Sequence, residues 1–465
     1  MSKTSKSGLK IFIFLVIAIV GSTILGIGSF LILSPGSEIF GISYNCNLAK
    51  TTISKFQVYG TEVDINMSHY NKVIIETKDA KVKVARGYNN AAVTNFEIDK
   101  SSYGFYYTGD KTDYTYDIYS SGDTLFFKLN EPEYSFLKLR AQTGLILNIN
   151  ANQQLQENLS FEITTQNGDV EIGGATSRTE TRTYPINLNN ISIQTENGTI
   201  IFNDTAFVKN NIDLQNNNGT VLFKSELNSN NVNIKSENGN VNVNSNDLNV
   251  TNLNIESTKS DIKIEYISGN VHLNVAAGVF KFKQIHGNFI STEKIDSARI
   301  IVEKVDGNVQ ICNNQGRFTV DIKDTSGEIN ILTNAGDVKI GNIRKQATIE
   351  TRTANVDITV AQNNINRIMI ETKSGSVRAN FKSILEGHRI TTETGRIEMK
   401  CLIQCAFYLN ANSENGYINM IWKGEKTKGE EIINSSIGGE NPNPINKLTI
   451  FSNYGDIIID RYSGD

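Results

Sequence analysis

The chain has 465 residues, a formal net charge of −4 and only five prolines. This charge excludes the basic surface on which nucleic acid or anionic lipid headgroups bind, and the abundance of aliphatic residues, Asn and Gly is typical of strands, not of a disordered chain. Four cysteines are too few for a fold built on disulfides, so we expect the cysteines to be buried and to pack as small hydrophobic residues.

An uncharged apolar stretch occupies residues 11–34, and about 20 such residues are enough to cross a bilayer. Residues 1–10 carry three lysines, whereas the first charge after the stretch is Glu38. By the positive-inside rule, residues 1–10 are a cytoplasmic tail and the C-terminal part of the chain is extracellular. A cleaved signal peptide is the alternative, although its apolar region usually spans about 7–15 residues. We therefore predict an uncleaved transmembrane signal anchor at residues 11–34, followed by a short stalk at residues 35–52.

Residues 53–136 are predicted to form a strand-rich capping region. Within it, residues 88–136 are crowded with aromatic side chains. These side chains could form a platform for a sugar ring or a protein partner. Alternatively, they could cover the open first rung of the repeat that follows, because an uncovered edge promotes aggregation. The candidate binding surface consists of Tyr103, Phe105, Tyr106, Tyr107, Tyr114, Tyr116 and Tyr119.

Residues 137–465 repeat one pattern: Thr or Ser, two residues, a small residue, a polar residue, then apolar-x-apolar. In Asn231–Val243 (NVNIKSENGNVNV), apolar and polar residues alternate on both sides of the corner, as in strands with one buried face. We expect a positive φ at the corner glycine. The corners at 198, 219, 239 and 260 are 21, 20 and 21 residues apart, and the step from 416 to 455 would be two rungs. The corner glycines are Gly168, Gly198, Gly219, Gly239, Gly336, Gly375, Gly395, Gly416 and Gly455.

A fixed period near 20 residues with strand pattern and no helical pattern is typical of a β-solenoid, in which each rung stacks its Val and Ile side chains on the next. A second glycine series (Gly269, Gly287, Gly307 and Gly327) lies about half a period away, so each rung has at least two corners. A β-sandwich, the competing fold, needs no fixed period. We predict an all-β, right-handed parallel β-solenoid with about 20-residue rungs, preceded by one transmembrane α-helix. Insertions at 173–187 and 424–447 could carry recognition or be tolerated without a role.

No arrangement of residues typical of catalysis stands out. The four histidines have no metal-ligand spacing, and neither a phosphate-binding loop nor a nucleophile elbow is found. Some solenoids cleave polysaccharides with carboxylates on one face. Glu171, Asp357 and Glu398 fall on outward positions here, although outward charges are usually just solvated. We therefore predict no enzymatic activity, no cofactor and no metal.

The iterated corner, as in TTQNGDVEI (164–172), KSENGNVNV (235–243) and TNAGDVKI (333–340), resembles the bacterial "putative adhesin" β-solenoid family, a membrane-anchored domain of unknown function. The resemblance covers about residues 70–465 and implies the fold and an N-terminal anchor, but no catalytic residues. We expect a membrane-anchored extracellular β-solenoid that acts as an adhesin-like or structural surface interaction protein, with a surface glycan or a protein as partner. The alternatives are a solenoid that binds or cleaves a polysaccharide, and an envelope-stress accessory protein.

Overall fold

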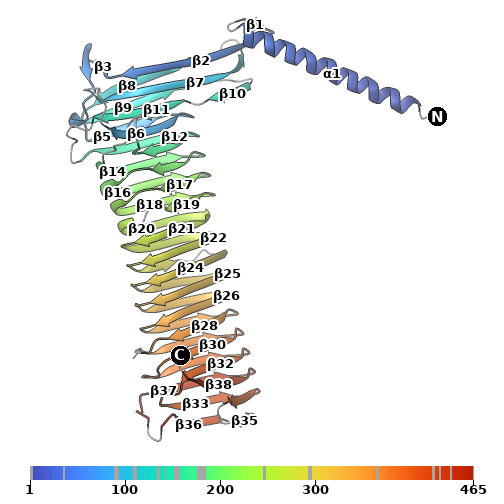
Figure 1. The fold of residues 1–465 in the computed structure, drawn as a ribbon, viewed down its shortest axis with the longest axis vertical. Coiled ribbons are helices and arrows are strands. Elements are labelled where there is room, and N and C mark those ends of the chain that lie inside the picture. The colour runs from blue at the N-terminus through green and yellow to red at the C-terminus, as the bar shows by residue number, and fades with distance from the viewer. Residues whose placement is uncertain are drawn as a thin grey trace. The chain divides into compact units, whose positions relative to one another are not determined.

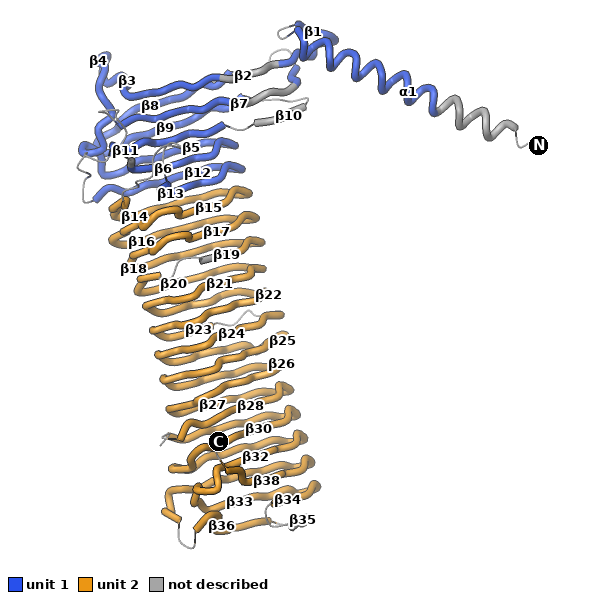
Figure 2. Tube along the Cα trace, viewed as in Figure 1, with its two compact units in different colours: residues 1–184 blue, residues 185–465 orange. Residues whose placement is uncertain are grey.

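Strands make up nearly all of the regular structure in the computed structural model of the chain, which describes residues 4–34, 37–87, 94–107, 113–132, 137–141, 143–150, 155, 158–174, 185–243, 248–291, 296–362, 366–421, 425–428, 431–439 and 442–463. The chain divides into two units, residues 1–184 and 185–465, which are described in turn (Figures 1 and 2). Parallel strands stacked in successive rungs dominate both units, which confirms the predicted β-solenoid.

One helix, α1 (Thr4–Leu33), precedes the strands of unit 1. Its segment Phe14–Leu33 is long and apolar enough to cross a membrane, a property that it shares with signal sequences. Most of the side chains of this segment are exposed, but Leu31 is buried against Tyr44 and Phe105. The helix therefore presents an apolar surface that the described part of the chain leaves uncovered.

Residues 42–53 form a strand, where we expected a stalk over residues 35–52. This strand, β2 (Ile42–Ile53), pairs antiparallel with β7 (Asn95–Tyr107) along its whole length. A two-residue strand, β1 (Glu38–Ile39), pairs with the start of β2. The partner of β2 lies far along the sequence, so no local signal separated this strand from an irregular stalk.

In unit 1 the rungs are ordered differently in space and in sequence. The strands of three rungs are, in chain order, β5 (Lys72–Glu76) and β6 (Lys81–Gly87), β9 (Thr124–Asn130) and β11 (Gly144–Asn150), and β12 (Ser160–Thr165) and β13 (Val170–Ile172). β5 pairs in parallel with both β9 and β12, and β6 pairs in parallel with both β11 and β13. The first rung in the sequence therefore lies between the other two.

Antiparallel strands flank the rung of β9 and β11. β8 (Thr115–Ser121) pairs with β9, while β7 pairs with β11 and with β10 (Leu137–Ala141). Phe96 on β7 stacks on Phe127 of β9 with 4.3 Å between ring centroids. A separate hairpin of β3 (Lys55–Val58) and β4 (Thr61–Asp64) precedes the short 3-10 helix η1 (Met67–His69).

Unit 2 consists of two series of parallel strands that repeat once per rung. The first series precedes the Thr or Ser corner: β14 (Ile186–Thr195), β16 (Ala206–Asn216), β18 (Leu227–Ser236), β20 (Leu248–Lys259), β23 (Phe289–Ser291), β27 (Ala347–Thr351), β29 (Ile368–Thr372) and β31 (His388–Thr392). The second series follows the corner: β15 (Ile200–Phe202), β17 (Thr220–Phe223), β19 (Asn240–Val243), β21 (Ile262–Ile267), β24 (Ser297–Val305), β28 (Asn355–Val360), β30 (Val377–Phe381) and β32 (Ile397–Leu402). Three long strands run through the corner and belong to both series: β22 (Asn270–Ile285), β25 (Val309–Thr325) and β26 (Ile329–Ile343).

The core of unit 2 is a set of apolar columns that follow the strand register. Ile191, Ile212, Val232, Leu253 and Val271 occupy one register position on successive rungs, and all are completely buried. Burial of such a side chain contributes roughly 1.5–3 kcal/mol relative to exposure. Each rung therefore depends on its neighbours for its buried surface, as the sequence period predicted.

The corner glycines have a role other than the one we predicted. Gly336 has a positive φ of 116°, but the other corner glycines do not. Instead, each rung approaches the next so closely that a Cβ on Gly219 would lie 2.0 Å from the carbonyl oxygen of Gly198, and a Cβ on Gly375 would lie 1.8 Å from that of Ala354. The contact is between backbones of successive rungs, so a turn type could not reveal it.

The hydroxyl at the start of several corners also has a structural role. The Oγ1 of Thr392 accepts a hydrogen bond of 2.9 Å from the N–H of Gly395, three residues later. Such a bond satisfies a backbone donor inside a tight corner. The same contact recurs for Thr165 with Gly168, Thr195 with Gly198, Thr372 with Gly375, Ser413 with Gly416 and Ser452 with Gly455.

The second glycine series marks the opposite corner, where an asparagine ladder runs along the stack. In its first part, the side-chain amide of each Asn donates to the side-chain oxygen of the Asn one rung earlier, at 3.0–3.1 Å. Later rungs use the backbone N–H as the donor, at 2.8–2.9 Å. The ladder residues are Asn211, Asn231, Asn252, Asn270, Asn288 and Asn308, and Glu328 supplies the final N–H.

The C-terminal rung is inserted between two rungs that precede it in the sequence. β37 (Lys447–Ser452) pairs in parallel with both β31 and β33 (Phe407–Ser413), and β38 (Ile457–Tyr462) pairs in parallel with both β32 and β34 (Tyr417–Met420). Gly455 consequently lies between Gly395 and Gly416. The step from 416 to 455 is therefore not two rungs further along the stack, as we expected, but one rung back.

The predicted insertion at 424–447 contains strands that pair with the last rung in space. β35 (Glu425–Lys428) pairs antiparallel with β34, and β36 (Glu431–Ile437) pairs antiparallel with β33 (Figure 1). These two strands occupy hydrogen-bonding groups that a terminal rung would otherwise expose. Of the other insertion, 173–187, residues 175–184 lie outside the described residues.

Three cysteines lie where small hydrophobic residues would. Cys401 and Cys405 are buried, Cys312 is half-buried, and all three are free thiols. Burial raises the pKa of the Cys401 thiol to about 12, so this group stays protonated and unreactive near neutral pH. The side chain of Cys46 lies outside the described residues.

His388 makes the fold sensitive to acid. Its side chain is buried against Phe381, and its Nδ1 accepts a 3.1 Å hydrogen bond from the N–H of Ile368. Burial lowers its pKa from 6.5 to about 4. Between these values the unfolded chain binds a proton that the folded chain does not, so the free energy of unfolding decreases as the pH falls from 6.5 to 4, by about 3 kcal/mol.

Urea unfolding at pH 7 and at pH 4.5 measures this contribution. We expect His388→Leu to lose less stability than the wild-type chain on acidification, whatever its stability at pH 7. The exposed His272 provides the control, since His272→Gln should retain the wild-type pH dependence. An equal loss of stability in the wild-type chain and His388→Leu would contradict the assignment.

Candidate binding grooves

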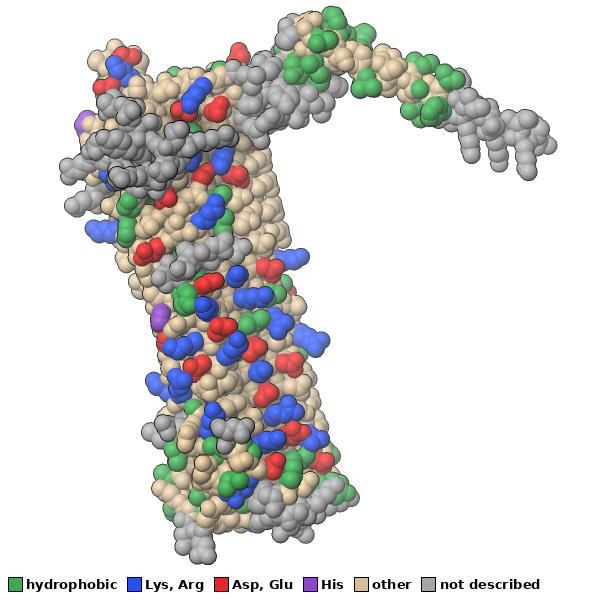
Figure 3. Space-filling view, in the orientation of Figure 1, with side chains coloured by type: hydrophobic (Ala, Val, Ile, Leu, Met, Phe, Trp, Pro, Cys, Tyr) green, Lys and Arg blue, Asp and Glu red, His purple; other side chains and the backbone are tan. Residues whose placement is uncertain are grey.

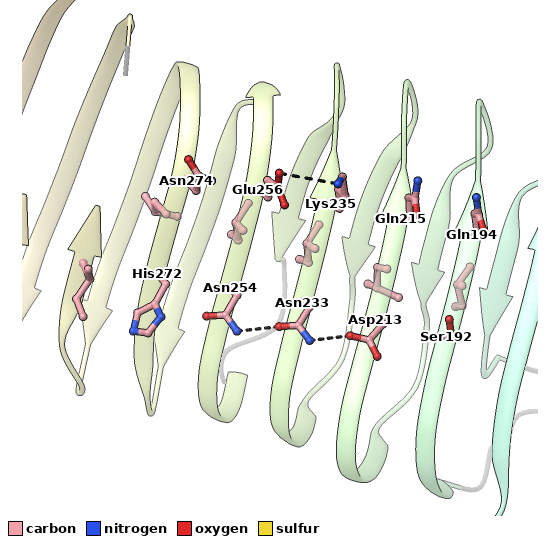
Figure 4. Close-up of a pocket in the computed structure, with 16 residues that line it drawn as sticks. Ser192, Gln194, Asp213, Gln215, Asn233, Lys235, Asn254, Glu256, His272 and Asn274 are labelled. Carbon is pink, nitrogen blue, oxygen red and sulfur yellow. Dashed lines mark hydrogen bonds and ion pairs between the residues drawn. The ribbon is translucent and has the colours of Figure 1, made fainter. Parts of the chain in front are cut away.

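A polar groove of about 580 Å³ crosses the outer face of six successive rungs in unit 2 (Figure 4). It lies on β14, β16, β18, β20 and β22, whose inward side chains form the core column described above, and it extends to Ile290 on β23. Alternation along a strand sends every second residue outward. The outward residues form two rows in strand register: Ser192, Asp213, Asn233, Asn254 and His272 in one, and Gln194, Gln215, Lys235, Glu256 and Asn274 in the other.

Contacts within the first row run from rung to rung. The amide of Asn233 donates to Asp213 Oδ1 at 2.6 Å, and the amide of Asn254 donates to Asn233 Oδ1 at 2.7 Å. These bonds fix the direction in which the amides point, and Figure 4 shows them as a line across three rungs. The first row is therefore preorganised by its own ladder.

The second row is less constrained. Lys235 Nζ lies 3.9 Å from Glu256 Oε1, with both side chains largely exposed. The side chains of Gln194, Gln215 and Asn274 make no hydrogen bond with the described part of the chain, and neither does the imidazole of His272 at the end of the first row. With two carboxylates and one ammonium, the groove has a low net charge, and its lining contains no Phe, Tyr or Trp. Its donors and acceptors are thus available to a polar, weakly charged ligand.

A second groove of about 470 Å³ lies further along unit 2 and is rich in charge. Glu398 Oε1 lies 2.8 Å from an Arg396 guanidinium nitrogen, and Glu398 Oε2 lies 3.3 Å from Arg378 Nε. Asp357 lines the same groove, and Arg378 occupies the register position between Asp357 and Glu398. Figure 3 shows acidic and basic side chains interspersed along this part of the chain. The structure thus brings together two of the three outward carboxylates that we noted, Asp357 and Glu398. Each of them occupies a register position next to Arg378.

Glu171, the third outward carboxylate, lies in unit 1. Its side chain is within 2.7 Å of Lys81 Nζ and 3.8 Å of Lys83 Nζ, on the adjacent β6. These contacts are cross-strand ion pairs on the solenoid surface. No group of three His, Cys, Asp or Glu side chains that could hold a metal ion occurs among the described residues.

The predicted aromatic surface is divided between the interior and the exterior of unit 1. Phe105 and Tyr114 are buried, and Tyr114 Oη shares a 2.5 Å hydrogen bond with Thr143 Oγ1. Tyr107, Tyr116 and Tyr119 are exposed, whereas Tyr106 is half-buried. Tyr119 stacks on Phe126 with 4.8 Å between ring centroids. The side chain of Tyr103 lies outside the described residues, so at most part of the set can form one external surface.

A family model described as Toastrack DUF4097 matches residues 70–334 and 328–460 of the chain. Among solved structures, the chain is similar to a "putative cell adhesion protein" from Clostridium sporogenes, at 8% sequence identity and a TM-score of 0.17, with 90% of this chain and 100% of that chain covered. It is also similar to a "putative adhesin" from Bacteroides fragilis, at 10% identity and a TM-score of 0.22, with 90% and 97% covered. No curated protein matches the chain.

Proposed function

The chain belongs to the Toastrack DUF4097 family, and from this premise we propose that it is a membrane-anchored, adhesin-like surface protein that acts by binding and not by catalysis. The observation that carries the proposal is the combination of an uncovered apolar helix with a solenoid whose polar groove includes three amide side chains without a partner in the described part of the chain. The helix would hold the chain in the membrane, with its lysine-flanked end in the cytoplasm. The solenoid would then present the groove outside the cell.

The anchor is tested by comparing the full chain with a chain that lacks residues 1–34. We expect the full chain to stay in the membrane fraction after alkaline carbonate washing, because Phe14–Leu33 can span the hydrocarbon core. The shortened chain should be released. Protease added to intact cells should digest the solenoid units of the full chain. If cells that express the full-length gene instead yield a soluble protein whose N-terminus lies after the apolar stretch, the stretch is a cleaved signal peptide.

Binding is tested with cells of a host that lacks the protein, with and without the displayed full chain. We expect displayed chains to increase attachment to surfaces coated with cell-envelope material. A control chain with the anchor and the residues up to 184 lacks unit 2 and its grooves. Equal attachment of all three cell types would count against an adhesin-like role.

A second candidate function is cleavage of a polysaccharide, because Asp357 and Glu398 line the same groove with Arg378 between them. Two carboxylates and a cation are the kind of groups that such reactions use. Glu398, however, is engaged with two guanidinium groups, which suits a structural ion pair. Release of reducing ends from a polysaccharide by the wild-type chain, and not by Asp357→Asn or Glu398→Gln, would establish this activity and refute the non-catalytic proposal.

A further inference from the structure

We propose that the polar groove on β14, β16, β18, β20 and β22 binds an extended, uncharged polysaccharide that runs along the stacking direction of the rungs. This inference rests on the proposed surface-binding function and names the class of its ligand.

The groove repeats the same geometry on every rung. Gln194 and Gln215 occupy one register position, and Lys235, Glu256 and Asn274 continue it. With rungs about 4.8 Å apart, the five rungs that carry the two polar rows span roughly 19 Å. A linear polymer can place equivalent groups over successive rungs, whereas a compact ligand would use only part of this length.

The side chains suit hydroxyl groups. Amides both donate and accept hydrogen bonds, as hydroxyls do. Asp213 Oδ1 and Asn233 Oδ1 already accept the hydrogen bonds of the ladder in the first row. In the second row, the side-chain amides of Gln194, Gln215 and Asn274 have no partner in the described part of the chain. These amides, exposed in Gln194 and Asn274 and half-buried in Gln215, can be paired by a hydroxyl-rich ligand without breaking an existing contact.

Two other ligand classes fit less well. A polyanion would meet Asp213 and Glu256, and the one ammonium, on Lys235, lies 3.9 Å from Glu256. A peptide that adds a strand needs a free sheet edge, but each groove strand is paired on its flank with the next rung. The surface therefore favours a neutral hydroxyl-bearing polymer over an acidic polymer or a peptide strand.

The test measures binding of the full-length chain, in detergent micelles, to dextran, mannan, hydroxyethyl cellulose and, as an acidic polymer, polygalacturonate. We expect at least one neutral polymer to bind, and short oligomers of that polymer to bind more weakly, because several rungs act together. The variant Gln194→Ala/Gln215→Ala/Asn274→Ala should weaken binding at least tenfold. Substitutions of outward polar side chains such as these should leave the free energy of unfolding unchanged within about 0.5 kcal/mol.

A matched control is available further along the same strand series. Gln310, Asn330 and Thr348 occupy successive rungs in register, outside the groove. Their triple Ala variant should bind like the wild-type chain. Equal binding by the groove variant, preference for polygalacturonate, or no binding of any polymer would each overturn this inference. The cell-attachment experiment remains the separate test of the surface-binding function, because it does not depend on these polymers.

Discussion

Replacing Gly395 by Ala is expected to lower the free energy of unfolding by about 2–3 kcal/mol, because a new methyl group would be forced between two backbones. The added Cβ would lie 2.0 Å from the carbonyl oxygen of Gly375 and 2.8 Å from Thr392 Oγ1. The carbonyl of Gly395 in turn faces Gly455 on the next rung. Neither side can yield without moving a neighbouring rung, and packed interiors transmit such displacements.

Urea unfolding of Gly395→Ala beside Gly387→Ala provides the comparison. A Cβ on Gly387 meets no atom within 4 Å, so this control should unfold within about 0.5 kcal/mol of the wild-type chain. Ser260 and Ala354 occupy the corner position in two other rungs and carry a Cβ there. The expected loss of stability therefore applies to the contact between Gly375 and Gly395, and not to every corner. Unfolding of both variants at the same urea concentration would show that the rungs separate easily.

Removal of residues 447–465 is expected to disorder the part of unit 2 that follows Leu402. The deletion takes out a complete inner rung, including the fully buried Leu448, Ile450, Ile457 and Ile459. Loss of each such side chain typically destabilises a protein by about 2–5 kcal/mol. Limited proteolysis with mass spectrometry should find new cleavage sites between residues 403 and 446, while rungs before residue 388 stay protected.

The sequence period allows a different outcome that the same experiment detects. The corners at 395 and 416 are 21 residues apart, which is one ordinary rung step. If residues 407–420 moved onto β31 and β32 after the deletion, they would stay protected, and the expectation of disorder would be wrong. A chain that lacks only residues 463–465, which follow β38, should behave like the wild type in either case.

The architecture could be predicted because, in a solenoid, residues that contact each other on neighbouring rungs are separated by a nearly constant number of positions in the sequence. Each Val or Ile packs on a residue about 20 positions away, so the pattern of apolar and polar residues in one rung predicts the pattern in the next. The exceptions lie where partners are not one period apart. β2 pairs with β7, and β37 lies between β31 and β33, and neither arrangement leaves a periodic signal.

The candidate site was harder to predict. The aromatic residues of unit 1 stood out by composition, but Phe105 and Tyr114 are buried and cannot form part of an external platform. The groove residues did not stand out, since outward polar residues are common on any solvated strand. A signal existed in the spacing, because Ser192, Asp213, Asn233 and Asn254 lie 21, 20 and 21 residues apart. Such spacing predicts a row of side chains, whereas only the three-dimensional structure shows which part of the row lines a groove.

The inserted C-terminal rung has a consequence for the biogenesis of the protein. Residues 407–420 emerge from the ribosome before residues 447–462, yet their place in the stack depends on those later residues. At roughly 5–20 residues per second, the wait for about 40 further residues lasts a few seconds. During this time the edges of β31 and β32 are open to chaperones, proteases and other nascent chains. A chain shortened before residue 447 lacks β37 and β38, so these edges stay open unless residues 407–420 move onto them.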